Sequence, residues 1–399
     1  MNLNYTFSDK TKKLTYILMA IGVLAFVFAL IDKEVTGTRL WANLLIDGFF
    51  FFGISVGAVF FMSLQYAAQS AWPTVVKRVF EAVGMYLPVG AIFILIVIIG
   101  SAINGMSAGG HPLYSWMANN AANGDKVLQG KHAYLNVPFF IIRSVIYLGI
   151  FVFLARLMRK RSLAADLTED YLPIHYKNVM TAGIFIVFFG LAESMLSWDW
   201  IMSLTPHWFS TLFGWYVLSG MWVTALIVII LITFHLKSKG HLENVNENHM
   251  QDLGKWMFAI SILWSYLWFS QFMLIWYANI PDEVVYFQIR IDHYRILLWV
   301  TFLVNLLLPL ILLVSRDAKR NRKMLVTIAC IIFCTHWLDV FIMVMPSTVG
   351  EAWHIGIPEI GMFLGFIGLF TYVVLSSLAK APVQVKNHPY LEESVHHQI

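Results

Sequence analysis

Charged residues are scarce in this sequence. Asp, Glu, Lys and Arg make up 13% of its 399 residues, whereas soluble proteins contain roughly 25%. Hydrophobic residues make up 59%, which is more than a soluble fold of this size can bury. The shortage of charge therefore excludes soluble enzymes and nucleic-acid-binding proteins, and it predicts an all-α polytopic membrane protein.

Cysteine is also scarce. Cys330 and Cys334 are the two cysteines, and both lie in one apolar run, so they form no disulfide framework. Their spacing places them on one helix face, where two thiols without further ligands make no ordinary metal site. We expect both to be buried small apolar side chains.

Motifs for cofactors and nucleotides are missing as well. The sequence contains no Cys-x-x-Cys-His motif, no cysteine set for an iron–sulfur cluster and no Walker A pattern. His336 alone lies well inside an apolar run, while His235 falls at the end of one, so the paired axial histidines of a diheme b-type cytochrome are absent. We therefore expect no metal or redox cofactor bound by this chain, and no ATP hydrolysis.

Long apolar runs are plentiful. A spanning helix needs about 20 apolar residues, and the sequence contains ten such runs, at 14–31, 44–66, 82–103, 136–156, 178–200, 212–234, 256–278, 296–315, 324–345 and 358–379. We expect residues 1–380 to form one integral membrane domain and residues 381–399 a short polar C-terminal tail.

The basic residues predict the orientation of these spans. If the N-terminus is cytoplasmic, 20 Lys and Arg residues fall in cytoplasmic segments and six in outer segments. Cytoplasmic loops of membrane proteins carry such an excess. The distribution therefore predicts that both termini are cytoplasmic.

The fifth and ninth predicted spans end alike. Trp198-Asp199-Trp200 leads to Pro206, and Trp337-Leu338-Asp339 leads to Pro346, so that each Asp precedes its Pro by seven residues. Internal repeats are common in membrane proteins. We interpret spans 2–5 and 6–9 as two related four-helix bundles, with the first and tenth spans as extra helices; the alternative is chance similarity in a sequence rich in Trp, Met and Leu.

Ionisable residues inside spans are costly and are functional candidates for that reason. The candidates for proton transfer are Glu193, Asp199, His336, Asp339, Arg143, Asp47 and Glu359. Most fall in the outer half of the predicted membrane, which indicates a proton-accessible half-channel that opens outward. His336 and Asp339 share a helix face and can exchange a proton. The alternative is that Arg143 neutralises one carboxylate and that those near span ends meet water.

Aromatic residues are frequent in the seventh span. Trp264 and Trp268 are four residues apart and therefore share a face that can stack on a quinone ring. Aromatic residues at helical spacing also serve as bundle core or as an interfacial belt, and the sequence leaves both interpretations open.

Two segments carry a family resemblance. Trp198-Asp199-Trp200-Ile201-Met202-Ser203-Leu204-Thr205-Pro206-His207-Trp208-Phe209-Ser210 is one, and Trp276-Tyr277-Ala278-Asn279-Ile280-Pro281-Asp282-Glu283, continuing to Tyr286-Phe287, is the other. Both resemble the ActF-type membrane subunit of bacterial alternative complex III, a quinol:cytochrome c oxidoreductase. That subunit belongs to the polysulfide-reductase membrane-anchor (NrfD-like) superfamily.

The resemblance implies a multi-pass subunit of a respiratory complex in the bacterial inner membrane. It implies partners: a sister NrfD-like subunit, a multihaem cytochrome c, an iron–sulfur subunit and in some complexes a terminal oxidase. Haem c and Fe–S clusters would lie on those partners, quinol or menaquinol would react near the sister subunit, and this chain would carry a proton path. The sequence leaves two alternatives open, a secondary transporter and a purely structural membrane anchor.

Overall fold

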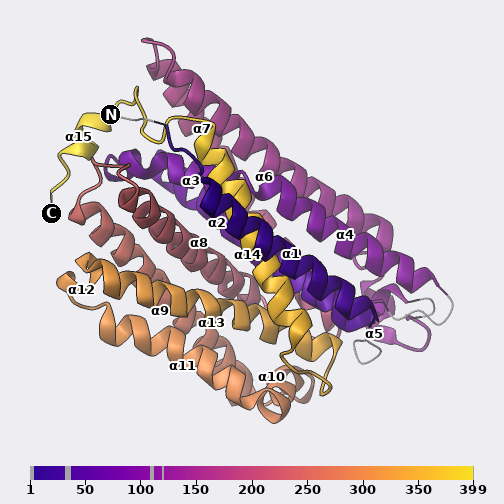
Figure 1. Ribbon diagram of the computed structural model, residues 1–399. Helices are drawn as coiled ribbons and strands as arrows, with labels where there is room; N and C mark the ends of the chain where they lie inside the picture. Colours follow the sequence, from indigo (N-terminus) through magenta and orange to yellow (C-terminus); the bar gives the residue numbers. More distant parts are fainter. Residues whose placement is uncertain (1–3, 32–36, 108–111, 119–120, 399) are drawn as a thin grey trace.

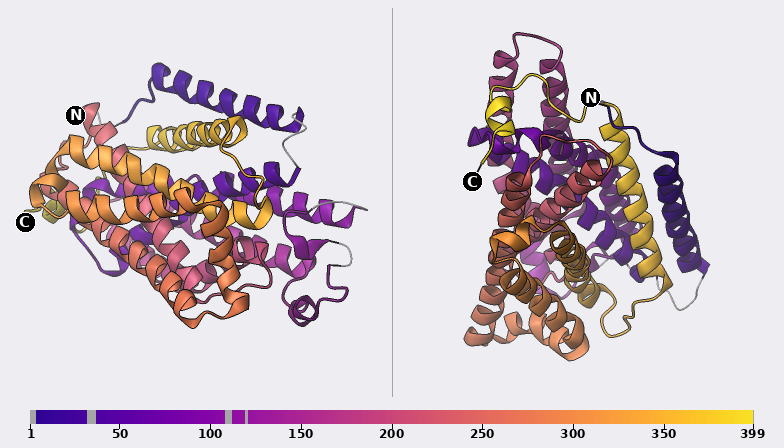
Figure 2. Two further views of the ribbon diagram at one scale, coloured as in Figure 1. Left: turned by 90° about the horizontal axis from the view of Figure 1, so that it is seen from below. Right: turned by 60° about the vertical axis from the view of Figure 1, so that its left-hand side comes forward.

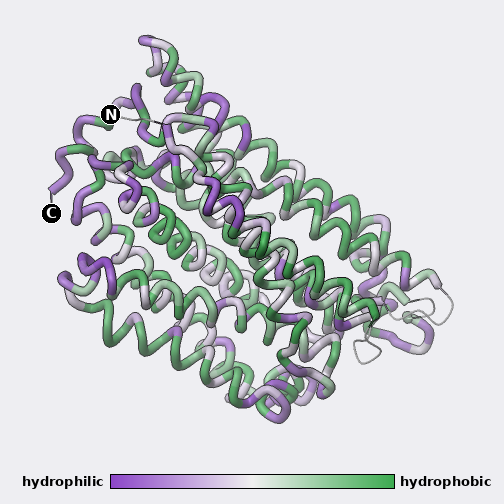
Figure 3. The backbone as a smooth tube through the Cα atoms, viewed as in Figure 1, coloured by the Kyte–Doolittle hydropathy of each residue, from purple (hydrophilic) through white to green (hydrophobic). Residues whose placement is uncertain are grey.

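The computed structural model describes residues 4–31, 37–107, 112–118 and 121–398, which are mostly α-helical and include no strand. Ten helical segments of this part are long and apolar enough to cross a membrane. Each coincides with one of the predicted runs, and the chain is therefore an all-α, multi-pass membrane protein. Figure 3 shows apolar residues along the middle of the helices and polar residues gathered at both ends.

Most of the helices extend beyond the apolar runs that predicted them, whereas α11 (Arg295–Leu312) ends three residues before the end of its run. The spans are α1 (Asp9–Ile31), α2 (Gly37–Ala67), η1 (Trp72–Val76) with α3 (Lys77–Gly84) and α4 (Leu87–Met106), α6 (Val137–Ala165), α7 (Leu172–Trp200), α8 (Leu212–Ser238), α9 (Glu247–Ala278), α11 (Arg295–Leu312), α13 (Arg322–Thr348) and α14 (Ile357–Ala379). Short helices join them: η2 (Ser115–Met117), α5 (Lys126–Lys131), η3 (Met202–Leu204), α10 (Pro281–His293), α12 (Arg316–Arg320) and α15 (Leu391–Val395).

Local sequence explains where several helices begin. The Asn136 side chain accepts the Phe139 N–H at 3.0 Å and caps α6, and a proline occupies one of the first two positions of α4, α6, α7, α10 and α14. Proline fits there because the first N–H groups of a helix have no partner inside it.

Two four-helix bundles form the body of the molecule, as predicted (Figure 1). In the first, α2, α4, α6 and α7 contact one another in a closed circuit, and in the second α8, α9, α11 and α13 do the same. The bundles meet where α2 packs on α8 and α13, and where α8 packs on α7. Helices α7 and α13, which carry the two Trp and Asp motifs, thus hold the same place in their circuits.

Helices α1 and α14 form a pair outside the bundles. Figure 2 shows α14 between α1 and the rest of the molecule. The two helices approach so closely that a Cβ atom on Gly22 would lie 2.5 Å from the Cα atom of Gly365. Small residues commonly allow such close approach between membrane helices.

The two ends of the bundle differ. Both termini lie at one end, here called the terminal end, with α12 and α15, whereas α5 and α10 lie at the opposite end (Figure 1). The tail folds back on the terminal end: the Ser394 hydroxyl donates to the Trp72 carbonyl at 2.9 Å, and Asn387 donates to the Ala165 carbonyl at 3.2 Å.

The predicted burial of the cysteines is wrong. Cys330 and Cys334 are both exposed on α13. The apolar character of a span satisfies the lipid as well as the protein core, so it does not predict which face of the helix is buried.

Candidate functional site

Asp199 is held by an arginine inside the first bundle. The Arg143 guanidinium on α6 donates to both carboxylate oxygens of Asp199, at 3.0 and 2.8 Å. It also donates to the Tyr134 carbonyl at 2.9 Å and lies 3.8 Å from the centre of the Tyr134 ring. Both charges are buried. This bidentate ion pair favours the charged form of the Asp199 carboxyl. Arg143 thus neutralises one carboxylate, as in the alternative interpretation that the sequence left open.

Glu359 has a second ion pair, between α14 and α2. Its carboxylate accepts from Arg39 at 2.8 and 2.9 Å, from the Asn43 amide at 2.9 Å and from the Gly356 N–H at 2.9 Å. These four donors hold the carboxylate at the start of α14. The arrangement is that of a structural link between the outer helix pair and the first bundle.

Asp47 lies on the contact between the two bundles. Its carboxylate on α2 accepts from the Trp337 indole on α13 at 2.8 Å, and the residue is 1% exposed. Glu193 on α7 is equally buried, and its Oε1 atom has no hydrogen-bond partner within the described part of the chain. Neither carboxylate has an arginine or lysine in a salt bridge in that part.

Within the described residues, the hydrogen-bond partners of Asp339 are neutral. Its carboxylate on α13 accepts hydrogen bonds from the Tyr216 hydroxyl on α8 and, at 3.3 Å, from the Trp264 indole on α9. All three side chains are buried. Neutral donors stabilise an anion less than a guanidinium does, so this carboxyl is the better suited of the two motif aspartates to gain and lose a proton.

His336 lies beside Asp339 across a small cavity. The cavity measures about 20 Å³ and is lined by both residues, by Gly220 and Thr224 of α8 and by Phe49 and Phe50 of α2, among others. One water molecule requires about 10–15 Å³. The His336 Nε2 atom is buried without a hydrogen-bond partner in the described residues. The two side chains line the same cavity, and no direct hydrogen bond joins them in the described residues.

Arg290 on α10 completes this region and was missed in the sequence. It is 2% exposed and donates to the carbonyls of Ile342 and Met343 on α13, each at 3.1 Å. Burial lowers the pKa of its guanidinium, and Asp339 lies within electrostatic range of it. The segment lies between the seventh and eighth predicted spans, where Pro281-Asp282-Glu283 is a typical helix start.

The two indoles proposed for quinone contact have different surroundings. Trp264 packs against Tyr216 and His336, with ring centres 5.8 and 5.0 Å away. Trp268 stacks on Phe302 at 4.3 Å and also contacts Phe272. Both rings are buried among side chains of the second bundle, so Trp264 belongs to the Asp339 site and Trp268 to the aromatic core.

The two segments that resemble the ActF type meet in space. Trp208 of the first stacks on Tyr286 of the second, with ring centres 3.9 Å apart and planes 12° apart. Tyr286 in turn packs against the guanidinium of Arg290 at 3.4 Å. The paired segments therefore cover the second bundle beside Asp339 at the opposite end.

The described residues contain no group of three or more His, Cys, Asp or Glu side chains that could hold a metal ion. Comparison of the sequence with protein-family models and with curated proteins gives no match. The site is therefore interpreted from its own geometry: a buried carboxyl with neutral donors, a neighbouring histidine and space for one water molecule.

Proposed function

We propose that this chain is a membrane subunit of a respiratory quinol:cytochrome c oxidoreductase complex in the bacterial inner membrane. It provides a proton-conducting half-channel and a scaffold for redox subunits, and binds no redox cofactor itself. The observation that carries the proton role is Asp339, bound by Tyr216 and Trp264 beside the unpaired nitrogen of His336. The family assignment is supported by the two segments that resemble the ActF type and by their contact through Trp208 and Tyr286.

The location of the site supports a half-channel that opens at the opposite end. Asp339 lies nine residues before the end of α13 and Tyr216 four residues after the start of α8. At 1.5 Å per residue these are roughly 14 and 6 Å along the helices. Both of these helix termini lie at the opposite end of the molecule. A proton on Asp339 is therefore closer to that end than to the terminal end.

The proton moves between Asp339 and His336 through one water molecule in the cavity. The Tyr216 and Trp264 donors orient the Asp339 carboxylate, and the unpaired Nε2 of His336 gives the proton a second acceptor. The buried charge of Arg290 favours release, because a cation close to a carboxyl stabilises its charged form.

Purification from native membranes in a mild detergent tests membership of the complex. We expect the chain to elute with subunits that show haem c absorption and the paramagnetic resonance of reduced iron–sulfur clusters. A chain that elutes alone contradicts the proposal. Substrate-dependent uptake by proteoliposomes that contain this chain alone would favour a transporter.

A structural anchor makes a different prediction. Under that alternative, Glu193→Gln and Asp339→Asn leave quinol turnover and proton release unchanged in the purified complex. Under the proposed function, Asp339→Asn lowers both.

A further inference from the structure

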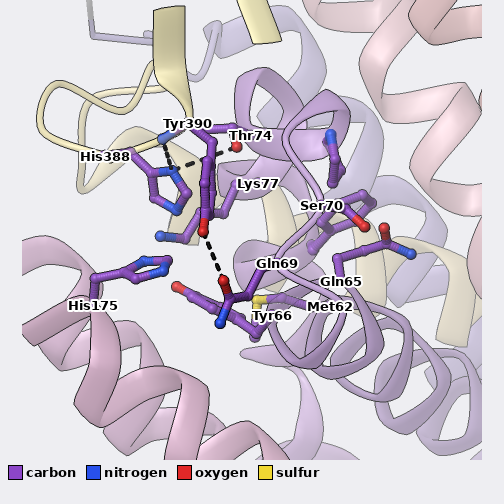
Figure 4. A pocket seen from close by; sticks show the side chains of 12 residues that line it. Met62, Gln65, Tyr66, Gln69, Ser70, Thr74, Lys77, His175, His388 and Tyr390 are labelled. Atoms are coloured by element: carbon purple, nitrogen blue, oxygen red, sulfur yellow. Dashed lines mark hydrogen bonds between the residues drawn. The ribbon is translucent and has the colours of Figure 1, made fainter. Parts of the chain in front are cut away.

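A second polar pocket lies at the terminal end, far along the chain from the Asp339 site. It measures about 30 Å³ and is lined by residues from the end of α2, from η1 and α3, from the start of α7 and from the tail. Figure 4 shows Lys77, His175, His388 and Tyr390 gathered around it. The tail thus supplies one wall, so the pocket is complete only when the tail is docked.

Lys77 brings a positive charge to this pocket. The residue is 8% exposed, and its ammonium forms no salt bridge or hydrogen bond with the described residues. The ammonium lies over the face of Tyr66, 4.9 Å from the ring centre. Glu81 on the same helix is paired with Arg78 at 2.6 Å. Because Glu81 already has another cation as its partner, it compensates the charge of Lys77 only in part.

Two histidines face the same space. The rings of His175 and His388 are 4.8 Å apart, and Figure 4 shows Lys77 on the same side of the pocket. His175 is 6% exposed, and neither of its ring nitrogens has a hydrogen-bond partner in the described part of the chain. Burial and the nearby Lys77 charge lower the pKa of His388 to about 2, so its ring is neutral.

Several hydrogen-bond donors line this pocket. The Nδ1 atom of His388 accepts the Tyr390 N–H at 3.3 Å, so the proton of the neutral ring is on Nε2. The Tyr66 hydroxyl oxygen accepts from Asn178 at 3.4 Å, which leaves its own proton free. With the Lys77 ammonium and one N–H of His175, four donor groups line the pocket.

We propose that this pocket binds an oxyanion of the phosphate type, either the phosphodiester headgroup of an anionic phospholipid or inorganic phosphate. Such a group supplies several acceptor oxygens and a negative charge, which complement the donors of Lys77, His175, His388 and Tyr66. The pocket also lies at the end of the molecule that has the excess of basic residues, and basic pockets between membrane helices bind acidic lipid headgroups.

Binding is measured on the full chain, purified in a neutral detergent without added phosphate. One arm adds phosphatidylglycerol or, as the uncharged comparison, phosphatidylcholine with the same acyl chains, and counts bound lipid by native mass spectrometry. The other arm adds sodium phosphate or sodium chloride at equal ionic strength and measures the midpoint of thermal unfolding.

Variants assign the binding to the pocket. Lys77→Gln and His175→Ala each remove one donor, whereas Lys380→Gln removes an exposed lysine from the same end. Loss of one hydrogen bond to a charged group weakens binding roughly ten- to hundredfold. We expect that loss in the two pocket variants, and wild-type affinity in Lys380→Gln. Two pocket variants are used because either of them alone could unfold.

The outcomes separate the two sources of the oxyanion. Retention of phosphatidylglycerol alone identifies a lipid headgroup, and stabilisation by phosphate alone identifies the soluble ion. Binding of neither ligand to the wild-type chain overturns the proposal. Equal losses in Lys77→Gln and Lys380→Gln also overturn it, because the effect would then be that of surface charge.

Discussion

The two bundles hold equivalent aspartates in opposite ways. Asp199 on α7 and Asp339 on α13 each precede a proline by seven residues, and their helices occupy the same place in their circuits. Their depth differs, because α7 ends one residue after Asp199 whereas α13 continues for nine residues after Asp339. Asp199 is bound by a guanidinium on both oxygens, whereas Asp339 is bound by a phenol and an indole beside a cavity. One bundle thus fixes its carboxylate as a charge, and the other leaves its carboxyl able to exchange a proton.

This difference shows how two similar helix circuits can hold a buried aspartate differently. A bidentate arginine gives geometry and favours the charged form of the carboxyl. Neutral donors give geometry without fixing the charge, and a water-sized cavity gives the proton an exit. The first bundle is therefore suited to support and the second to proton transfer.

The largest effect is expected when the ion pair of the first bundle is broken. Arg143→Met leaves Asp199 buried without its cation, and removal of one partner from a buried ion pair costs about 3–5 kcal/mol of unfolding free energy. Denaturant unfolding of the purified chain measures this loss. The control is Arg156→Met, which removes an exposed arginine from the same helix. Equal stability of both variants would show that Arg143 does not hold the first bundle together.

A large effect of another kind is expected in the second bundle. Asp339→Asn keeps the size of the side chain but removes the titrating group, and loss of a positioned acid–base group typically slows proton transfer by roughly a hundredfold. Quinol turnover and proton release by the assembled complex are the measurements. Asp199→Asn, compared per amount of folded complex, should keep the wild-type rate. Equal rates for the two variants would show that Asp199 and Asp339 do not differ in their role in proton transfer.

A smaller effect is expected when the cavity is narrowed. A Cβ atom on Gly220 would lie 3.7 Å from Trp264 and 3.8 Å from the His336 Nδ1 atom, which is ordinary contact. Gly220→Ala should therefore exclude the bridging water and slow proton release by about tenfold, while the helix gains about 0.5–1 kcal/mol of stability. Gly149→Ala on α6 has open space around the new atom and should give the same gain in stability with an unchanged rate. An unchanged rate in Gly220→Ala would show that the cavity is not on the path.

The fold was largely predictable and the partners of the site were not. Ten apolar runs gave the ten spans, because lipid imposes length and composition on every spanning helix. The spacing of Asp199 and Asp339 from their prolines predicted equivalent helix ends, and this is wrong: α7 ends at Trp200, before Pro206, whereas α13 continues through Pro346 to Thr348. Neither pattern shows which residues of different helices contact each other. The pairing of Asp199 with Arg143 was therefore one of two alternatives, and Tyr216 was not predicted as a partner of Asp339.

Lateral packing explains the remaining differences. The exposure of Cys330 and Cys334 and the burial of Arg290 both depend on which side of a helix faces protein. The sequence of an apolar helix carries little information on that choice, because lipid and protein core accept the same side chains. Ionisable residues inside a span carry more, because they are costly in lipid, and His336 was therefore a candidate from the sequence alone.

The close contact of α1 and α14 has a consequence for biosynthesis. Helix α1 packs chiefly on α14 and hardly on the bundles, yet about 325 residues separate the end of α1 at Ile31 from the start of α14 at Ile357. During translation α1 therefore enters the bilayer long before its partner exists, and the glycine face at Gly22 is covered by lipid until then. Assembly of this protein is completed by a late docking step, in which its first and tenth spans meet.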